Sequence, residues 1–391
     1  MSHDKSEAGK LKVLLLLHEL SRTGAPKIAI ESLQLLQDQV DVMAISLQRG
    51  EMEGAVTSFA QLHVLPEPSH HQDNNRKKTL LERYAARRER DTWRTRFETW
   101  QPDVIYANSV ASLPVAHYVA VPQAPVLLHV HELDMFIAWY DRMDPYRLRR
   151  WPARYIAVAD AVKQVLVGSF GIAPDKIASI PEFFDDVAID ASLQKSAALA
   201  AAQPAHAGPY VVGGAGRIGW RKGFELWLQT AVYLADKLGR ENIRFEWVGA
   251  EDDLREFEMR LTARKLGVDD IVSILPMTRD PFPSYSRFDT FLMTSWEDPF
   301  PIVVLEAMGM GKPVVCIRNS GGPAEQVAET GIVVERFDAK LLGDAICTLR
   351  DNPTYAAQLG DAARVRARTH FTKSAVVPRI LEELRATAGM K

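Results

Sequence analysis

Short apolar runs recur along the first half of the chain, separated by polar turns and by segments of helical periodicity. A continuous apolar run of this length is typical of a strand buried on both faces of a parallel sheet. Strands that alternate with helices predict a doubly wound α/β fold. The expected strands span residues 12–17, 40–47, 103–109, 124–132, 154–160 and 176–181, and the expected helices span 28–36, 113–121 and 161–170.

The second half of the chain repeats the same alternation. Strands are expected at 210–216, 243–250, 271–276, 289–295, 312–317 and 331–335, with helices at 223–237, 254–266 and 302–310 and further helices beyond 335.

Domain boundaries follow from the gap between the two patterns, because residues 190–208 contain no strand pattern and few large apolar groups. We predict an N-terminal Rossmann-like domain over 1–190, a linker or exposed helix over 191–208, and a second Rossmann-like domain over 209–372. A last helix, 373–391, is expected to pack back toward the first domain. Two such domains would face a central cleft, and ligands bind outside the carboxyl ends of the strands in doubly wound sheets.

Composition narrows the class of protein. The chain has 391 residues, 25% of them charged, and a net charge of -3, which gives no reason to expect nucleic-acid binding. Its two cysteines, Cys316 and Cys347, exclude a disulfide scaffold and a multi-cysteine zinc site. The polar start and the absence of an apolar run of about 20 residues favour a cytoplasmic protein.

One segment, 76–96, departs from this balance, with nine Lys or Arg against three Asp or Glu at helical length. One interpretation is a solvated helix with a packed apolar stripe. The other is an interfacial helix that faces an anionic membrane or a lipid-diphosphate acceptor.

The first candidate motif is GAGRIGWRKG, residues 214–223, which follows an expected strand. Glycines allow a tight turn and close approach of a ligand, and two cations beside a helix N-terminus suit a diphosphate. The alternative is an ordinary turn with solvated basic residues. The motif is not a Walker A loop, because it lacks the GK[ST] ending.

The second candidate motif is SWEDPFPIVVLEAMGMGKPVV, residues 295–315. Its carboxylates, Asp298 and Glu306, could accept paired hydrogen bonds from sugar or ribose hydroxyls. The N–H groups of Ile302 and Val303 open a helix and could meet an anion or a sugar oxygen. The alternative is an acidic cluster that only complements the helix dipole.

Together the two motifs resemble glycosyltransferase family 4, a family of retaining enzymes with the GT-B fold. The GAP turn (24–26), the HVHE strand end (129–132) and RYIAVADAVKQVL (154–166) extend the resemblance through the first half, and Pro301 stands where the family usually has glycine. The matching residues of the second half are Gly216-Arg217, Lys222-Gly223, Ser295, Phe300, Leu305-Glu306-Ala307, Gly311 and Pro313-Val314-Val315.

The resemblance implies roles for individual residues in binding a nucleotide-sugar donor. Arg217 and Lys222 match the diphosphate-binding pair, Glu306 the ribose-binding glutamate, and Asp298 the acidic residue near the donor sugar. Backbone near Gly249 and Met277 is expected to contact the base. The remaining expected donor contacts are Gly24, Ala25, Gly216, Pro301, Ile302 and Val303.

His131 matches a strand-end histidine that faces the transferred sugar in the family. His129 and His131 stand on one face of a strand at a spacing that also suits a metal. Three interpretations stay open: a metal ligand, a structural histidine, and a sugar or acceptor contact, which the resemblance favours. With Asp298, Arg217 and Lys222, His131 completes the expected catalytic set.

The function implied is transfer of a hexose or deoxyhexose from a nucleotide-diphosphate sugar to an acceptor hydroxyl, with retention and without a metal or other cofactor. The expected acceptor is a glycan or lipid-linked molecule of bacterial surface polysaccharide or glycoconjugate assembly. The alternatives are a non-catalytic sugar-nucleotide-binding scaffold subunit and a GT-B epimerase or phosphorylase.

Overall fold

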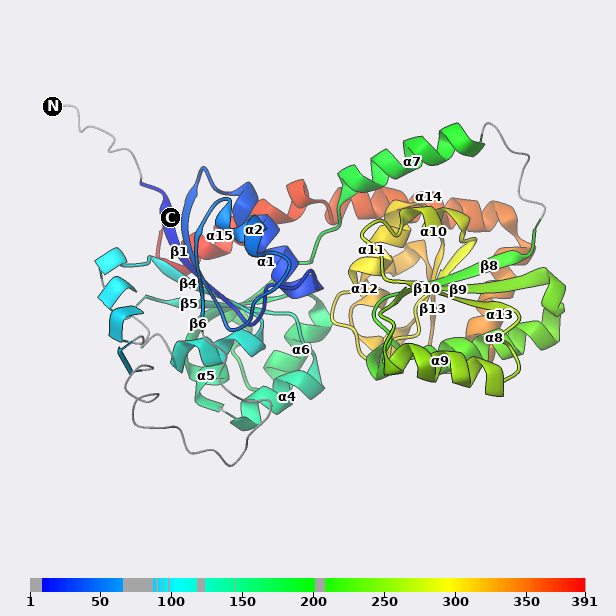
Figure 1. The fold of residues 1–391 in the computed structure, drawn as a ribbon, viewed down its shortest axis with the longest axis horizontal. Helices are drawn as coiled ribbons and strands as arrows, with labels where there is room; N and C mark the ends of the chain where they lie inside the picture. Colours follow the sequence, from blue (N-terminus) through cyan, green and yellow to red (C-terminus); the bar gives the residue numbers. More distant parts are fainter. Residues whose placement is uncertain are drawn as a thin grey trace. The chain divides into compact units, whose positions relative to one another are not determined.

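The computed structural model describes residues 9–65, 87–88, 91–93, 95–97, 99–117, 124–143, 145–200 and 208–390. The chain divides into two compact units (Figure 1). Unit 1 comprises Met1–Val158, Val162–Ile180 and Val377–Lys391, and unit 2 comprises Ala159–Ala161 and Pro181–Val376.

Unit 1 is built on a seven-stranded sheet with the order β3-β2-β1-β4-β5-β6-β7, in which all neighbouring strands are parallel. The inner strand β1 carries the apolar run Val13–Leu17, which is fully buried. The strands are β1 (Leu11–Leu17), β2 (Val40–Ser46), β3 (Gln61–Val64), β4 (Val104–Asn108), β5 (Val126–Val130), β6 (Pro152–Ala157) and β7 (Ile177–Ser179).

Helices connect these strands, as parallel pairing requires. In the described part of unit 1, two segments are 3₁₀ helices, η1 (Val110–His117) and η2 (Pro174–Lys176). The α-helices are α1 (Gly24–Leu35), α2 (Glu53–Thr57), α4 (Asp134–Met143), α5 (Pro145–Arg150), α6 (Asp160–Gly168) and α15 (Lys373–Thr387), whose residues from Val377 onward belong to unit 1.

Unit 2 repeats the arrangement with a six-stranded parallel sheet in the order β10-β9-β8-β11-β12-β13. Its core lies between this sheet and the helices, around the fully buried Trp227 and Phe245. The strands are β8 (Tyr210–Ala215), β9 (Ile243–Ala250), β10 (Val272–Pro276), β11 (Thr290–Leu292), β12 (Val314–Ile317) and β13 (Ile332–Val334).

The helices of unit 2 cover both faces of its sheet. They are α7 (Asp186–Ala200), α8 (Phe224–Leu238), α9 (Leu254–Lys265), α10 (Phe282–Arg287), α11 (Ile302–Gly309), α12 (Pro323–Val327), α13 (Ala339–Asp351) and α14 (Pro353–His370), with the 3₁₀ helices η3 (Trp220–Lys222), η4 (Arg240–Asn242), η5 (Arg318–Ser320) and η6 (Ala328–Thr330). Figure 1 shows α8 and α9 on one face and α10 and α11 on the other.

Some details differ from the sequence-based expectations. The boundary expected after residue 190 lies at Pro181, because α7 packs on α10 and α11 and Asp190 pairs with Arg368, all within unit 2. Residues 191–200, expected to be a linker or an exposed helix, form the end of α7. At the other end of the chain, α15 is tied to unit 1 by the ion pair of Glu383 with Arg154, at 2.8 Å.

Two elements of unit 1 were not expected in their observed form. The strand β3 lies in a stretch where the sequence showed no strand pattern, and it pairs only with β2 at the sheet edge. The described part of the helix expected at 113–121 belongs to the 3₁₀ helix η1, which contains Pro114 and follows Ser109, a residue with a φ of 83°. Residues 118–121 lie outside the described residues. Proline has no N–H to donate, which disfavours a regular α-helix there.

The basic segment 76–96 lies mostly outside the described residues, so its contact with a membrane stays a prediction. Within the described part, the ring of Trp93 packs against that of His63 with centroids 3.6 Å apart and planes tilted by 31°, and Phe97, just beyond the segment, is fully buried. Among the described helices, none is both long and apolar enough to cross a membrane.

Candidate active site

Each sheet reverses its strand order at one point, between β1 and β4 in unit 1 and between β8 and β11 in unit 2. In doubly wound sheets the loops at the carboxyl ends of these strands form the usual ligand-binding crevice. Most of the sequence-predicted residues follow these strands.

The turn after β8 depends on two glycines whose backbones lie in close contact. Gly216 and Gly249 have φ values of 122° and 123°, a region that L side chains rarely adopt. A Cβ atom on Gly249 would lie 2.6 Å from the carbonyl oxygen of Gly216. That same oxygen accepts a hydrogen bond of 2.9 Å from Nε1 of Trp247. Both predicted glycines therefore shape the turn that carries Arg217.

Lys222 and Asp298 form the central ion pair of unit 2, with 2.6 Å between Nζ and Oδ2. Asp298 is 5% exposed, and Ser295 also donates to it over 3.4 Å. Its backbone is fixed as well, because its N–H donates to Ser320 and its carbonyl accepts from Gly322. The pair joins the loop after β8 to the loop after β11, across the switch point.

Arg217 and Arg221 are placed differently from Lys222. The side chain of Arg217 is 69% exposed and forms an ion pair with Glu251, in the loop after β9. Arg221 donates from Nε to the carbonyl oxygen of Glu297 over 3.1 Å, and so helps to fix the segment that leads to Asp298. Of the two predicted cations, Lys222 is therefore held by a buried carboxylate, whereas Arg217 is largely exposed and pairs with Glu251.

Pro301 precedes the first residue of α11, so Ile302 and Val303 lie in the first turn of that helix. N–H groups of a first turn have no acceptor within the helix itself. The carbonyl of Pro301 accepts from Nε2 of Gln326 at 3.1 Å and from the N–H of Val304. These two hydrogen bonds fix the start of α11, which follows Asp298 closely in the chain.

Glu306 lies one turn further along α11 and accepts a 3.2 Å hydrogen bond from the hydroxyl of Tyr285. Tyr285 is buried, and desolvation together with the negative charge of Glu306 raises its pKa well above the ordinary value. The hydroxyl therefore stays protonated and orients the carboxylate. Nothing in the sequence motif pointed to Tyr285.

Met277, expected to contact the base, has a side chain that is 60% exposed. Its own N–H donates to the carbonyl of Ala250 over 2.7 Å. A hydrogen bond from this backbone N–H to a base would have to replace that contact.

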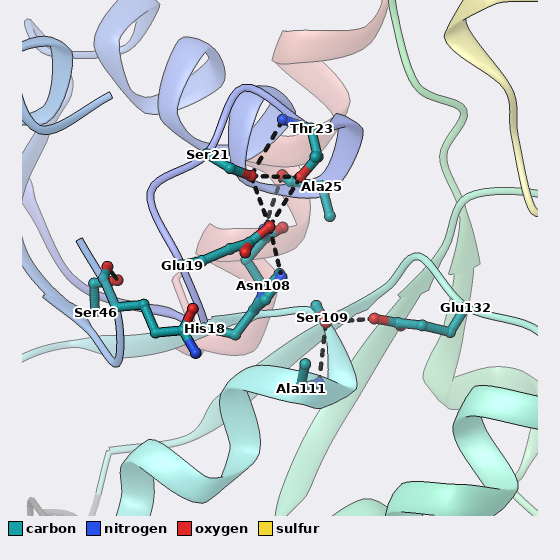
Figure 2. A network of polar contacts seen from close by, with 11 residues as sticks. His18, Glu19, Ser21, Thr23, Ala25, Ser46, Asn108, Ser109, Ala111 and Glu132 are labelled. Atoms are coloured by element: carbon teal, nitrogen blue, oxygen red, sulfur yellow. Dashed lines mark hydrogen bonds and ion pairs between the residues drawn. The ribbon is translucent and has the colours of Figure 1, made fainter. Parts of the chain in front are cut away.

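In unit 1, Gly24 and Ala25 form the first turn of α1, just after the loop that follows β1. Glu19 organises this loop, because the hydroxyls of Ser21 and Thr23 both donate to its carboxylate (Figure 2). The neighbouring His18, with the two hydroxyls, lowers the pKa of Glu19 to about 2. The loop is thus held by a carboxylate that stays ionised.

His131 stands just beyond β5, and its Nε2 lies 2.9 Å from Oδ1 of Asn108 at the end of β4. The amide nitrogen of Asn108 in turn donates to the carbonyl of Ala25 over 2.8 Å. The structure therefore brings two predicted site elements, the GAP turn and His131, together through a residue that the sequence analysis did not single out.

His129 lies behind His131, with ring centroids 4.0 Å apart, and is fully buried. Burial holds its pKa well below the ordinary value, and its Nδ1 is 2.6 Å from the hydroxyl of Tyr106. Within the described ranges, no three His, Cys, Asp or Glu side chains are grouped so as to hold a metal ion.

The end of β4 also carries Ser109, whose hydroxyl bonds to Glu132 of the HVHE motif (Figure 2). The other oxygen of Glu132 accepts from the N–H of His131 at 2.9 Å. Glu132 therefore fixes the backbone of His131. The signal that could have found these residues is their place: the polar pair Asn108-Ser109 ends an apolar strand beside the HVHE strand.

Comparison with known proteins gives a consistent assignment. A family model described as Glycosyltransferase Family 4 matches residues 24–187, and one described as Glycosyl transferases group 1 matches residues 209–352. The chain is 31% identical over 157 residues to the D-inositol 3-phosphate glycosyltransferase of Pseudarthrobacter chlorophenolicus, covering 39% of this chain and 37% of that protein.

A second relative is the lipopolysaccharide core biosynthesis glycosyltransferase LpsD of Rhizobium meliloti, 28% identical over 174 residues, or 44% of this chain and 48% of that protein. The chain thus spans less than half the length of either curated relative.

Among solved structures, Anabaena HepE in complex with UDP and glucose superimposes with a TM-score of 0.77 at 19% identity. The superposition covers 96% of this chain and 100% of HepE. HepE has also been solved with UDP and with UDP-glucose. With the two parallel sheets of seven and six strands, these matches show that the chain belongs to the family 4-like glycosyltransferases of the GT-B fold.

Proposed function

We propose that this protein transfers a sugar from a nucleoside diphosphate sugar to an acceptor hydroxyl, with retention of the anomeric configuration and without a metal ion. The observation that carries the proposal is the Lys222–Asp298 pair beside Gly216, at the switch point of unit 2. The family matches support the class of reaction, and the complexes of HepE with UDP and UDP-glucose support a uridine nucleotide as the first donor to test.

Donor binding begins with the diphosphate. Lys222 keeps its ammonium in a fixed place through Asp298, and the first turn of α11 adds the N–H groups of Ile302 and Val303. Arg217 exchanges its exposed contact with Glu251 for a phosphate oxygen. Preorganised cations of this kind stabilise the negative charge that develops on a leaving diphosphate.

Glu306 binds the donor ribose in this proposal, with its carboxylate oriented by Tyr285. Glu306→Gln removes the charge and one acceptor, so UDP should bind about tenfold more weakly while the fold survives. Isothermal titration with UDP measures the effect, and Glu258→Gln on the exposed surface of α9 is the control. Unchanged UDP affinity would make Glu306 a purely structural residue.

Retention by double displacement needs a carboxylate nucleophile next to the anomeric carbon. The matched carboxylates are both engaged elsewhere, Asp298 with Lys222 and Glu306 with Tyr285. We therefore propose attack from the face that the diphosphate leaves. The acceptor oxygen bonds to the anomeric carbon, the bond from that carbon to the phosphate oxygen breaks, and the acceptor proton passes to the leaving phosphate.

His131 positions the transferred sugar in this scheme, held by Asn108 and Glu132. The sugar is a hexose or deoxyhexose, and the acceptor belongs to surface polysaccharide or glycoconjugate assembly. LpsD, named for lipopolysaccharide core biosynthesis, supports that setting. A peripheral contact with anionic membrane through 76–96 would bring the enzyme to a lipid-linked acceptor.

The test is a screen of nucleotide sugars by thermal shift, followed by turnover with candidate acceptors and NMR assignment of the new linkage. A donor that binds only the folded protein raises its apparent stability. An α-linked donor should give an α-linked product, and an inverted product would overturn the mechanism. Nucleotide binding without transfer or hydrolysis would favour a scaffold subunit, and orthophosphate dependence or product isomerisation would favour a phosphorylase or an epimerase.

A further inference from the structure

Asn108 is the residue through which unit 1 joins the loop after β1 to the strand end that carries His131. It is the last residue of β4, directly at the switch point, and it is fully buried. Its amide bonds to Ala25, 83 residues earlier, and to His131, 23 residues later. A single buried side chain therefore links two segments that were predicted separately to contact the donor.

The chemistry of the partners fixes the orientation of this amide. The carbonyl oxygen of Ala25 can only accept a hydrogen bond, so the amide nitrogen of Asn108 must face it. The amide oxygen then faces Nε2 of His131, and since that oxygen can only accept, Nε2 must carry a proton. The neutral ring of His131 is consequently the Nε2–H tautomer, with Nδ1 unprotonated.

The surroundings preserve this arrangement. His129, whose ring lies against that of His131, stays neutral because burial lowers its pKa. Glu132 holds the backbone N–H of His131 and is itself held by Ser109. The backbone and one ring nitrogen of His131 are therefore both fixed by polar contacts at the ends of β4 and β5.

From this geometry we propose that Asn108 is a positioning residue, which sets the tautomer and orientation of His131 and ties them to the first turn of α1. The proposal rests on the proposed function for its kinetic consequence. Its structural consequence, the Nε2–H tautomer, does not depend on that function.

Imidazole ¹⁵N NMR of the full chain tests the structural part directly, with His131 assigned by comparison with His131→Gln. The wild-type spectrum should show the Nε2–H tautomer. Asn108→Ala should shift the ring toward a mixture of tautomers, whereas Asn108→Asp, which keeps an acceptor at this position, should keep the proton on Nε2. A wild-type Nδ1–H tautomer, or an unchanged ring in Asn108→Ala, would overturn the proposal.

Kinetics test the consequence for turnover. Asn108→Ala should lower kcat about 10–100-fold, with a smaller change in the Kd for UDP. Asn108→Asp should recover part of kcat, because it keeps one of the two contacts. The control is Ser112→Ala. Ser112 lies four residues after Asn108, and its buried hydroxyl donates to the carbonyl of Ser109. The kcat of this variant should stay near that of the wild type.

The two failures are distinguishable. If the wild-type chain transfers no sugar from any nucleotide sugar, the proposed function fails while the NMR result still decides the tautomer. If the wild type is active and Asn108→Ala keeps full kcat with an altered tautomer, the kinetic role of Asn108 is overturned. If Asn108→Ala does not fold, the wild-type tautomer and the kcat of Asn108→Asp carry the test.

Discussion

The two units place a polar contact at the same topological position but build it from different chemistry. In unit 1 a neutral amide, Asn108, joins the segment after β1 to the end of β4. In unit 2 an ion pair, Lys222–Asp298, joins the segment after β8 to the segment after β11. Both contacts span the switch point of their sheet, where a ligand is expected.

The difference indicates which kind of chemical group each of these two positions is suited to contact. A buried amide with two fixed partners defines direction, because exchanging its nitrogen and oxygen would place two acceptors against each other at Ala25. An ion pair supplies charge, and the ammonium of Lys222, 20% exposed, can contact an incoming phosphate while Asp298 keeps it in place. Unit 1 is thus suited to orient neutral groups and unit 2 to bind an anion.

The largest expected effect comes from breaking the charged contact. Lys222→Ala should weaken UDP binding about 10–150-fold, the loss of a charge-assisted bond of ~1.5–3 kcal/mol. It also leaves Asp298 buried without its partner, which should lower the free energy of unfolding by ~3–5 kcal/mol. Titration with UDP and denaturant unfolding measure the two effects.

A double variant separates these effects. Lys222→Ala with Asp298→Asn should recover most of the stability but not the UDP affinity, because the buried charge is gone while the cation is still missing. Lys237→Ala, from a surface pair with Asp344, serves as the control and should change neither quantity greatly. Wild-type UDP affinity in both Lys222 variants would remove the diphosphate site from unit 2.

The next effect is expected in unit 1. His131→Ala should lower kcat by about 10²-fold and change donor affinity less, because its contact matters most as positive charge develops on the sugar ring. Steady-state kinetics and UDP titration give the two numbers, with His370→Ala on the exposed end of α14 as the control. A fully active His131→Ala enzyme would show that the neutral network of unit 1 serves the fold alone.

The sheets were predictable because most of their strands are short, continuous apolar runs, which are typical of strands buried on both faces of a parallel sheet. β1, β9 and the strands between them appear within a few residues of their expected bounds. The exception, β3, is a half-exposed edge strand of four residues, so it lacks the continuous apolar signal. The 3₁₀ form of η1 was not predicted because Pro114 and the left-handed Ser109 act on the backbone locally.

The candidate site was predictable only where a motif carried it. Lys222 and Asp298 stand in motifs 76 residues apart in sequence, and the fold pairs them directly. Asn108 and Tyr285 belong to no motif, and their importance arises only when strands bring them beside His131 and Glu306. Sequence spacing cannot report such contacts, since they depend on which strands become neighbours.

A lower pH should destabilise unit 1 more than unit 2, with a smaller effect than the substitutions above. Burial lowers the pKa of His129 well below 6.5 and that of His63 to about 4, so in unit 1 both histidines fold in the neutral form. In the unfolded chain the two histidines take up protons at a higher pH than in the folded chain. Their contribution to the free energy of unfolding is therefore fully present above about pH 6.5 and falls as the pH drops below that value. For a fully buried neutral histidine the loss at pH 5 is about 2 kcal/mol.

Hydrogen exchange at pH 7 and pH 5, corrected for the intrinsic rate, should therefore show unit 1 losing protection while unit 2 changes little. The described part of unit 2 contains one histidine, the exposed His370. His129→Gln, which keeps an acceptor for the hydroxyl of Tyr106, should reduce the pH dependence of unit 1. Equal losses in both units would contradict this reading.

The smallest expected effect is that of removing divalent cations. A leaving diphosphate needs positive charge, and two side chains can supply it: Lys222, fixed by Asp298, and Arg217, which can turn from Glu251 toward a phosphate. If the charge in unit 2 is the protein's own, kcat in excess EDTA should equal kcat without it, whereas Arg217→Ala should lower transfer in both buffers alike. A metal-dependent transferase assayed in the same EDTA buffer verifies that the chelator works. Loss of activity that Mg²⁺ or Mn²⁺ restores would mean that the ion pair of unit 2 is too weak an anion site alone, and that the donor brings its own cation.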